Sequence, residues 1–208
     1  MPNKPNLEII GKELLEKYNL KDYRQYFTFD FDINFDINFD NLDNLDNPDN
    51  LDNLIKSNIV IKNFIRTKLN ISFHDDYIDI IHKKIPEIGL NWHIDDCVIV
   101  TKKSVRKNKL NINNLFFSEP NYNKERYIKI TENKYLYYNN KFNKLPIKTI
   151  IFYSSTYGED FTGGILKLCD DTEIKPQKYT GIVLDSREAH MVTPVKSGNR
   201  FVTLVKIY

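Results

Sequence analysis

Two histidines and one aspartate in this sequence have the types and spacing that suit a metal ion. His93 and Asp95 are two residues apart, and His190 lies far downstream. On a β-strand, residues i and i+2 project from the same face, so His93 and Asp95 could bind one ion. Two imidazoles and a carboxylate on one face of an octahedron leave three open positions, as non-haem Fe(II) oxygenases require. We therefore expect the donor atoms of His93, Asp95 and His190 to lie within about 5 Å of each other.

A second His-x-Asp pair, His74 and Asp76, competes with this assignment. Residues 72–84 have acidic side chains at their start and lysines at their end, a pattern that predicts a helix. On a helix, residues i and i+2 point apart and cannot easily share a metal. The spacing therefore favours His93, and we expect His74 to cap the helix and His82 to lie on its solvated face.

Apolar spacing predicts the elements that position these residues. Residues 6–18 and 48–68 have apolar side chains three and four apart, which indicates two amphipathic helices. After Pro86, short β-branched runs separated by turn-forming residues indicate strands. These runs cover residues 97–100, 150–153, 181–184 and 201–208. Helices followed by strands predict an α+β fold built on a sandwich or barrel.

The chain divides into two predicted regions. Residues 1–85 form an N-terminal helical region that includes an Asp/Asn-rich, low-complexity segment at 27–54. That segment lacks the glycine and closing glutamate of a calcium loop, which favours a solvated loop or helix start. Residues 86–208 form the β-rich domain, with a basic insert at about 101–146.

Composition excludes several classes of protein. The 208 residues are 41% hydrophobic and 13% aromatic, which favours a folded protein over a wholly disordered chain. No apolar run approaches the roughly 18 to 20 residues of a membrane span, and no secretory signal is apparent, so we expect no membrane partner. Two cysteines favour a reducing, cytoplasmic location, or a host cytoplasm or virion if the A+T-biased residue usage reflects a virus. A net charge of +2 supports no argument from global charge.

The C-terminal block carries a family resemblance. Gly163-Gly164-Ile165-Leu166 is followed by His190-Met191-Val192-Thr193-Pro194-Val195, and then by Gly198-Asn199-Arg200. From about residue 89 onward, the chain resembles the Fe(II)/2-oxoglutarate-dependent dioxygenases, within them the prolyl 4-hydroxylase-like branch. The resemblance implies a double-stranded β-helix, or jelly-roll, with N-terminal helices packed alongside. It also implies that His93, Asp95 and His190 are the catalytic metal ligands.

The resemblance further implies a cosubstrate pocket. Arg200 would bind the distal carboxylate of 2-oxoglutarate, because a guanidinium fork matches a carboxylate with two parallel hydrogen bonds. Tyr153 matches a strand tyrosine whose hydroxyl assists the same carboxylate. Apolar residues would line the pocket and limit water access, namely Ile151, Leu166 and Val192. Lys206 departs from the pattern, since its inward-alternating position is apolar or aromatic elsewhere in the family.

By family likeness, the expected reaction hydroxylates a peptidyl residue, prolyl first and lysyl second, while 2-oxoglutarate is decarboxylated to succinate. Fe(II), 2-oxoglutarate and dioxygen are implied, with ascorbate as a candidate reductant. Two rivals stay open. One is a nucleic-acid demethylase of the same superfamily, whose usual paired arginines are not matched because Lys206 stands six residues after Arg200. The other is a non-catalytic binding module on the same fold.

Substrate choice is predicted from the basic insert. Residues 102–148 contain twelve Lys and Arg against three Glu, a local charge of +9, with tyrosines interleaved. Such a surface could follow a nucleic-acid strand by phosphate contacts and stacking, or attract an acidic protein. We expect it to flank the active-site cleft and to favour an acidic peptide substrate over nucleic acid.

Overall fold

The computed structural model describes residues 7–33, 48–85, 87–101, 127–131, 134–138 and 146–208. Two α-helices are present in this part of the chain, α1 (Leu7–Tyr18) and α2 (Pro48–Thr67), which confirms the two helices expected at 6–18 and 48–68. Two short 3₁₀ helices, η1 (Leu20–Tyr23) and η3 (Asp75–Tyr77), precede strands. No helix among the described residues is long and apolar enough to cross a membrane.

The largest sheet has five antiparallel strands in the order β1-β11-β7-β14-β2. Their bounds are β1 (Gln25–Thr28), β2 (Ile78–Lys84), β7 (Lys148–Tyr153), β11 (Thr180–Asp185) and β14 (Phe201–Ile207). β-Branched and aromatic residues dominate β7, β11 and β14, and these strands are almost entirely buried. The strands expected at 150–153, 181–184 and 201–208 are thereby confirmed.

A second antiparallel sheet has the order β10-β9-β12-β3 and is accompanied by the pair β13–β8. Its strands are β3 (Leu90–His93), β9 (Leu166–Leu168), β10 (Glu173–Ile174) and β12 (His190–Val192); the pair is β8 (Phe161–Gly163) and β13 (Val195–Gly198). One buried core joins this sheet to the five-stranded sheet, because Leu166 and Val192 pack in the same cluster as Ile151 and Leu204. The architecture is therefore a β-sandwich of mostly antiparallel strands.

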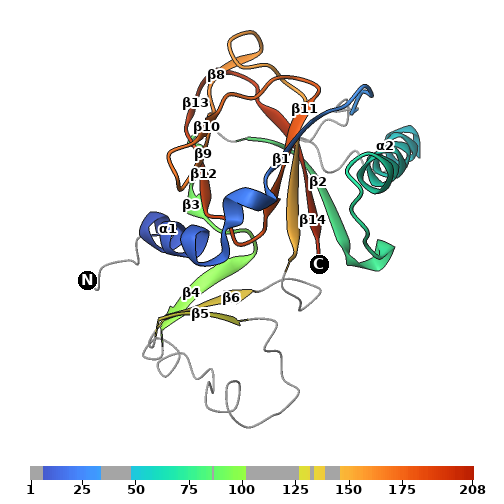
Figure 1. The fold of residues 1–208 in the computed structure, drawn as a ribbon. Coiled ribbons are helices and arrows are strands. Elements are labelled where there is room, and N and C mark those ends of the chain that lie inside the picture. Colours follow the sequence, from blue (N-terminus) through green and yellow to red (C-terminus); the bar gives the residue numbers. More distant parts are fainter. Residues whose placement is uncertain (1–6, 34–47, 86, 102–126, 132–133, 139–145) are drawn as a thin grey trace.

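The two helices cover the outer faces of the sandwich (Figure 1). Ile61 and Ile65 of α2 are fully buried in a cluster with Phe152 and Val205 of the five-stranded sheet. On the opposite side, Leu14 of α1 is buried in a cluster that includes Ile94, Cys169 and Ala189. Each helix therefore buries its apolar stripe against a different sheet.

The prediction of a helix at residues 72–84 is wrong. Residues 78–84 form strand β2, which pairs with β14 along its whole length, from Ile78 opposite Ile207 to Lys84 opposite Phe201. The acidic residues at 75 and 76 begin only the short η3, where Asp75 forms ion pairs with Lys62 and Arg66 of α2. β-Branched residues at 78, 80 and 81 and an open edge of β14 favour a strand over the charge pattern of a helix.

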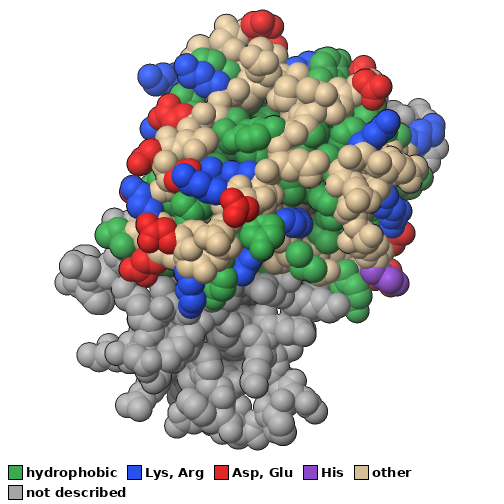
Figure 2. All heavy atoms as spheres, in the orientation of Figure 1, with side chains coloured by type: hydrophobic (Ala, Val, Ile, Leu, Met, Phe, Trp, Pro, Cys, Tyr) green, Lys and Arg blue, Asp and Glu red, His purple; other side chains and the backbone are tan. Residues whose placement is uncertain are grey.

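A third sheet has the order β4-β6-β5, with β4 (Cys97–Thr101), β5 (Tyr127–Thr131) and β6 (Lys134–Tyr138). The strand expected at 97–100 is confirmed by β4. The rest of the basic insert, and most of the Asp/Asn-rich segment, fall outside the described residues. On the face drawn in Figure 2, acidic and basic side chains of the described part are interspersed.

Candidate metal centre and anion-binding cavity

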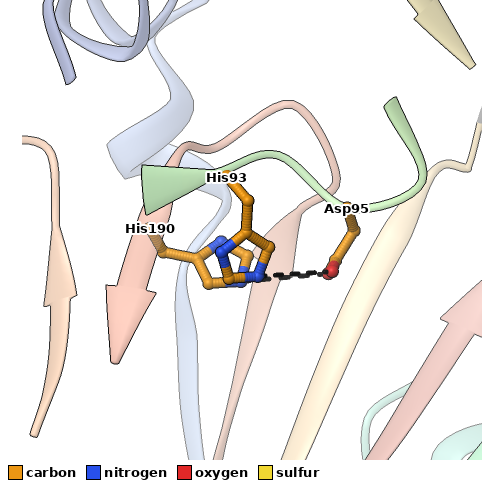
Figure 3. Close-up of side chains that lie close together, drawn as sticks. All are labelled: His93, Asp95 and His190. Carbon is orange, nitrogen blue, oxygen red and sulfur yellow. Dashed lines mark ion pairs between the residues drawn. The ribbon is translucent and has the colours of Figure 1, made fainter. Parts of the chain in front are cut away.

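His93, Asp95 and His190 lie together at one end of the second sheet (Figure 3). His93 is the last residue of β3, His190 is the first residue of β12, and the two are directly opposite each other in the strand pairing. Their ring centroids are 4.3 Å apart. Asp95 follows in the turn after β3, where Asp96 has a positive φ of 55°. Strand pairing thus brings together residues that are almost a hundred positions apart in the sequence.

The donor atoms of these three residues suit one shared ion. All lie within 4.8 Å of one another. The Nε2 atoms of His93 and His190 are 3.9 and 4.0 Å from the two carboxylate oxygens of Asp95. Bonds of roughly 2.0 to 2.2 Å to a common centre require only small closing movements from these positions. Among the described residues, no other group of three His, Cys, Asp or Glu side chains comes this close together.

Both imidazoles are held in the tautomer that a metal needs. His93 Nδ1 lies 2.7 Å from the backbone oxygen of Asn91, and His190 Nδ1 lies 2.9 Å from that of Glu188. A carbonyl oxygen only accepts, so each Nδ1 carries the hydrogen and each Nε2 keeps its lone pair. Burial, and secondarily the neighbouring His190, lower the pKa of His93 to about 4. At neutral pH, His93 is therefore uncharged and its Nε2 can donate a lone pair to a metal ion.

The Asp95 carboxylate is kept ionised. Burial by itself would raise its pKa, but His190, Lys206 and His93 outweigh that effect and lower the pKa to about 2, assisted by the Thr149 hydroxyl. Thr149 Oγ1 donates to Asp95 Oδ2 at 2.9 Å, and Lys206 Nζ lies 3.7 Å from Oδ1. A negative carboxylate with two oriented partners is the form that binds a divalent cation.

The turn that carries Asp95 is anchored to β14. Lys206 Nζ donates to Asp96 Oδ1 at 2.6 Å, and the hydroxyl of Tyr208 donates to Asp96 Oδ2. Lys206 is buried, and although burial lowers the pKa of its ammonium, Asp95 and Asp96 raise it above its ordinary value. A lysine in this otherwise apolar face is therefore explained by the two aspartates that it binds.

His190 is supported from the N-terminal side of the molecule. Arg24, directly after η1, donates from Nε to Glu188 Oε1 at 2.8 Å and also binds the same oxygen through Nη2. The same guanidinium donates to Asp170 Oδ2 at 3.0 Å. Because the backbone oxygen of Glu188 orients His190, this ion-pair cluster fixes a candidate metal ligand from a segment more than 160 residues away in sequence.

A small cavity, partly open to solvent, adjoins the three residues. His93, Asp95, His190 and Arg200 line it together with apolar side chains. The expected pocket residues Ile151, Leu166 and Val192 are all in the lining. Leu90, Val202 and Leu204 add to the apolar wall. The cavity therefore combines a metal-binding end, a cationic group and a largely dry wall.

Arg200 is buried, and no ionic partner of it occurs among the described residues. The residue is 2% exposed, and its Nε has no hydrogen-bond partner within the same ranges. The hydroxyl of Tyr153 is equally buried and unpartnered, and the guanidinium carbon of Arg200 lies 5.7 Å from the Tyr153 ring centroid. Burial lowers the pKa of Arg200 to about 10 and raises that of Tyr153. Two adjacent buried donors without acceptors mark a place for an anionic ligand.

Gly164 makes room for Arg200. It has a positive φ of 59°, and a β-carbon at this position would lie 2.8 Å from Arg200 Cδ and 3.0 Å from the Phe161 ring. A larger residue would therefore displace the arginine side chain as well as strain the backbone.

The competing pair, His74 and Asp76, lies elsewhere and is exposed. His74 Nδ1 accepts from the backbone N–H of Asp76 at 3.3 Å, so His74 caps η3. The expectation of a solvated His82 is wrong. It is buried on β2, with Nδ1 2.8 Å from Thr203 Oγ1 and Nε2 3.1 Å from Asn58 Oδ1 of α2.

The sequence alone does not reveal two residues that line the cavity or support a ligand, Lys83 and Thr149. It marks Lys206 as inward-facing but not its contacts with the two aspartates. The charge pattern puts Lys83 at the end of a predicted helix, whereas it lines the cavity from β2. The alternation of Ile81, Lys83 and Ile85 was a signal that could have revealed its inward position. No local signal marks Thr149, because its partner Asp95 comes from another strand connection.

No family model and no curated protein sequence matches the chain. Solved structures that resemble it include prolyl 4-hydroxylases. The prolyl-4-hydroxylase of Pseudomonas putida is 11% identical, with 99% of this chain and 96% of that chain covered and a TM-score of 0.47. The viral collagen prolyl hydroxylase of Paramecium bursaria Chlorella virus 1, in complex with 2OG, is 14% identical, with 97% and 90% covered and a TM-score of 0.38. A truncated form of that viral enzyme is 16% identical, with 96% and 83% covered and a TM-score of 0.39.

Proposed function

We propose that this protein is an Fe(II)/2-oxoglutarate-dependent dioxygenase with a double-stranded β-helix core. The observation that carries the proposal is the cavity that joins His93, Asp95 and His190 to the buried, unpartnered Arg200. Two neutral imidazoles and a carboxylate suit Fe(II) with open coordination positions. A desolvated guanidinium suits a carboxylate. A ligand with a chelating end and a distal carboxylate would satisfy both ends of the cavity at once.

Residue roles follow from the contacts. His93, Asp95 and His190 would hold the iron, which when bound supplies the oxidising chemistry of dioxygen. The reaction converts 2-oxoglutarate, dioxygen and a C–H bond into succinate, carbon dioxide and a hydroxylated product.

The remaining roles concern the cosubstrate. Arg200 and the Tyr153 hydroxyl would donate to its distal carboxylate, because both are buried donors without an acceptor. Ile151, Leu166 and Val192 would exclude water from the reaction.

The proposed substrate is a peptidyl residue, prolyl first and lysyl second. Support for this class comes from the resemblance of the Gly163–Gly164 and His190–Arg200 motifs to the prolyl 4-hydroxylase-like branch. The proposal that an acidic peptide is preferred rests on the charge of the insert at about 101–146.

Turnover provides the test. The protein is incubated with Fe(II), 2-oxoglutarate and a library of proline- and lysine-containing peptides, and succinate and the mass gain of one oxygen atom are measured. Asp95→Asn should abolish both signals, whereas Asp76→Asn, in the exposed pair, should leave them unchanged. Equal turnover by wild type and Asp95→Asn would remove the metal assignment. Hydroxylation or demethylation of an oligonucleotide, with no peptide modified, would move the substrate to nucleic acid.

A further inference from the structure

A second cationic side chain lines the same cavity. Lys83 lies on β2, and the residues two positions before and after it, Ile81 and Ile85, pack in the core between the two sheets. Since alternate residues of a strand share a face, Lys83 projects between them toward the cavity, which it lines. Its neighbour Lys84 is exposed on the opposite face. Placing an ammonium group in an apolar row has a desolvation cost that needs a reason.

Strand pairing fixes where Lys83 stands relative to Arg200. Lys83 is opposite Val202 of β14, and the backbone N–H of Ile85 donates to the backbone oxygen of Arg200 at 2.8 Å. Lys83 is therefore one strand across from Arg200 and displaced by two residues, about 7 Å along the strand axis. The displacement is toward Leu204 and Lys206, and Lys206 contacts Asp95. Lys83 thus stands between Arg200 and the metal-binding end.

The charges around Lys83 agree with a position between Arg200 and the metal-binding end. Burial lowers the pKa of its ammonium, Asp95 opposes the shift more than any other group does, and the cations Lys206 and Arg200 add to the lowering. Asp95 is already bound by Thr149 and lies close to Lys206. No ion pair or hydrogen bond of the Lys83 ammonium occurs within the part of the chain that the structure describes. The cavity consequently holds two cations, Lys83 and Arg200, that lack a bound anion.

We propose that Lys83 is a second carboxylate-binding residue of this site, and that it binds the carboxylate at the metal-proximal, 2-oxo-acid end of the cosubstrate. The inference rests on the proposed function. Arg200 would hold one end of the dianion and Lys83 the other, so that the cavity matches both charges of a dicarboxylate. Lys83 therefore acts on binding and orientation of the cosubstrate and is not a ligand of the metal.

Cosubstrate binding without turnover tests the proposal. Protein loaded with Mn(II) is titrated anaerobically with 2-oxoglutarate and, separately, with 2-oxovalerate, which keeps the 2-oxo-acid end and lacks the distal carboxylate. Fluorescence of Trp92, the single tryptophan and a neighbour of His93, reports binding, and calorimetry provides a second readout. The variants are Lys83→Met, Lys83→Arg and the matched control Lys84→Met.

Lys83→Met should weaken binding of both ligands by the same factor, roughly 10- to 100-fold, because each loses one charge-assisted hydrogen bond. Lys83→Arg should recover part of the affinity, and Lys84→Met should bind like wild type. Mn(II) affinity should not fall in Lys83→Met.

Failure has distinct signatures. Wild-type protein that binds Mn(II) but no 2-oxoglutarate contradicts the proposed function itself. If wild type binds 2-oxoglutarate and Lys83→Met binds it with the same affinity, only the role of Lys83 is overturned. A loss confined to 2-oxoglutarate, with 2-oxovalerate unaffected, assigns Lys83 to the distal carboxylate and overturns the proposal as stated.

Discussion

Replacing Arg200 by methionine should have opposite effects on stability and on ligand binding. Burial lowers the pKa of Arg200 from 12.5 to about 10, which corresponds to a desolvation cost of roughly 3 kcal/mol for the charged form in the folded state. Tyr153 opposes the shift only in part, and Nε has no hydrogen-bond partner among the described residues. Methionine fills part of the same volume without a charge. Allowing for imperfect packing, we expect Arg200→Met to raise the free energy of unfolding of the ligand-free protein by about 1 to 3 kcal/mol.

Thermal unfolding measures both effects in one experiment. A gain of this size should raise the midpoint temperature by about 2 to 12 °C for a chain of this length. In wild type, 2-oxoglutarate at about 100 times its Kd should add about 2.7 kcal/mol of stability in the presence of Mn(II). In Arg200→Met that increment should disappear, because the distal carboxylate has lost its cation. Arg200→Lys keeps the charge and serves as the control, with ligand-free stability near that of wild type.

Two results would refute this reasoning. If ligand-free Arg200→Met is less stable than wild type, the guanidinium has stabilising contacts that outweigh its desolvation. If 2-oxoglutarate still stabilises the variant by the wild-type increment, Arg200 does not hold the carboxylate.

Three further predictions concern the metal centre, the effect of pH and the N-terminal ion-pair cluster. Asp95→Asn should weaken Mn(II) binding at least about 100-fold, measured by calorimetry, whereas Asp76→Asn should not change it. The pKa of His82 is lowered by burial to about 4 from an ordinary 6.5, so the unfolded chain takes up a proton first as the pH falls. The part of the free energy of unfolding that depends on neutral His82 should be fully present above pH 6.5 and decline by about 2 to 3 kcal/mol toward pH 4.5. In urea unfolding, His82→Asn should lose less stability than wild type between pH 6.5 and pH 4.5. An equal loss in the two proteins would contradict this role of His82. Arg24→Met should cost about 3 to 5 kcal/mol in urea unfolding, because it strands buried carboxylates, and adding Glu188→Gln should recover part of the loss.

Much of the sandwich could be predicted from sequence because its core strands carry their own signal. Runs such as Ile150 to Tyr153 are apolar, β-branched and short, and they form the buried strands expected. Residues 78–84 show the limit of such reasoning. Charged ends favoured a helix there, and only pairing with β14, more than 100 residues later, makes the strand preferable. Propensity and charge placement are weak against a long-range ladder of hydrogen bonds.

The candidate site divides along the same line. His93, Asp95, His190 and Arg200 belong to spaced motifs, so their grouping could be anticipated, and their roles stay predictions. Lys83 and Thr149 act through neighbours from other strands, and no short pattern announces such contacts. The role of Arg24 is even harder to predict from sequence. Arg24 reaches His190 only indirectly, through Glu188, and only in the folded sandwich.

The position of β14 has a consequence for how the protein acquires its structure. β14 is the last strand in sequence, yet it lies between β7 and β2 rather than at an edge of its sheet. Until residues 201–207 have been synthesised, β7 and β2 each present an unpaired edge, and Arg200 has no place in the cavity. In the same way, Gln25 of β1 can pair only after its partner Val183 of β11 has been synthesised. Contacts this distant in sequence favour slow folding and a late, nearly simultaneous assembly of sheet and site. During translation, the exposed edges of β7 and β2 would be the segments most prone to aggregation, and the natural targets of chaperones.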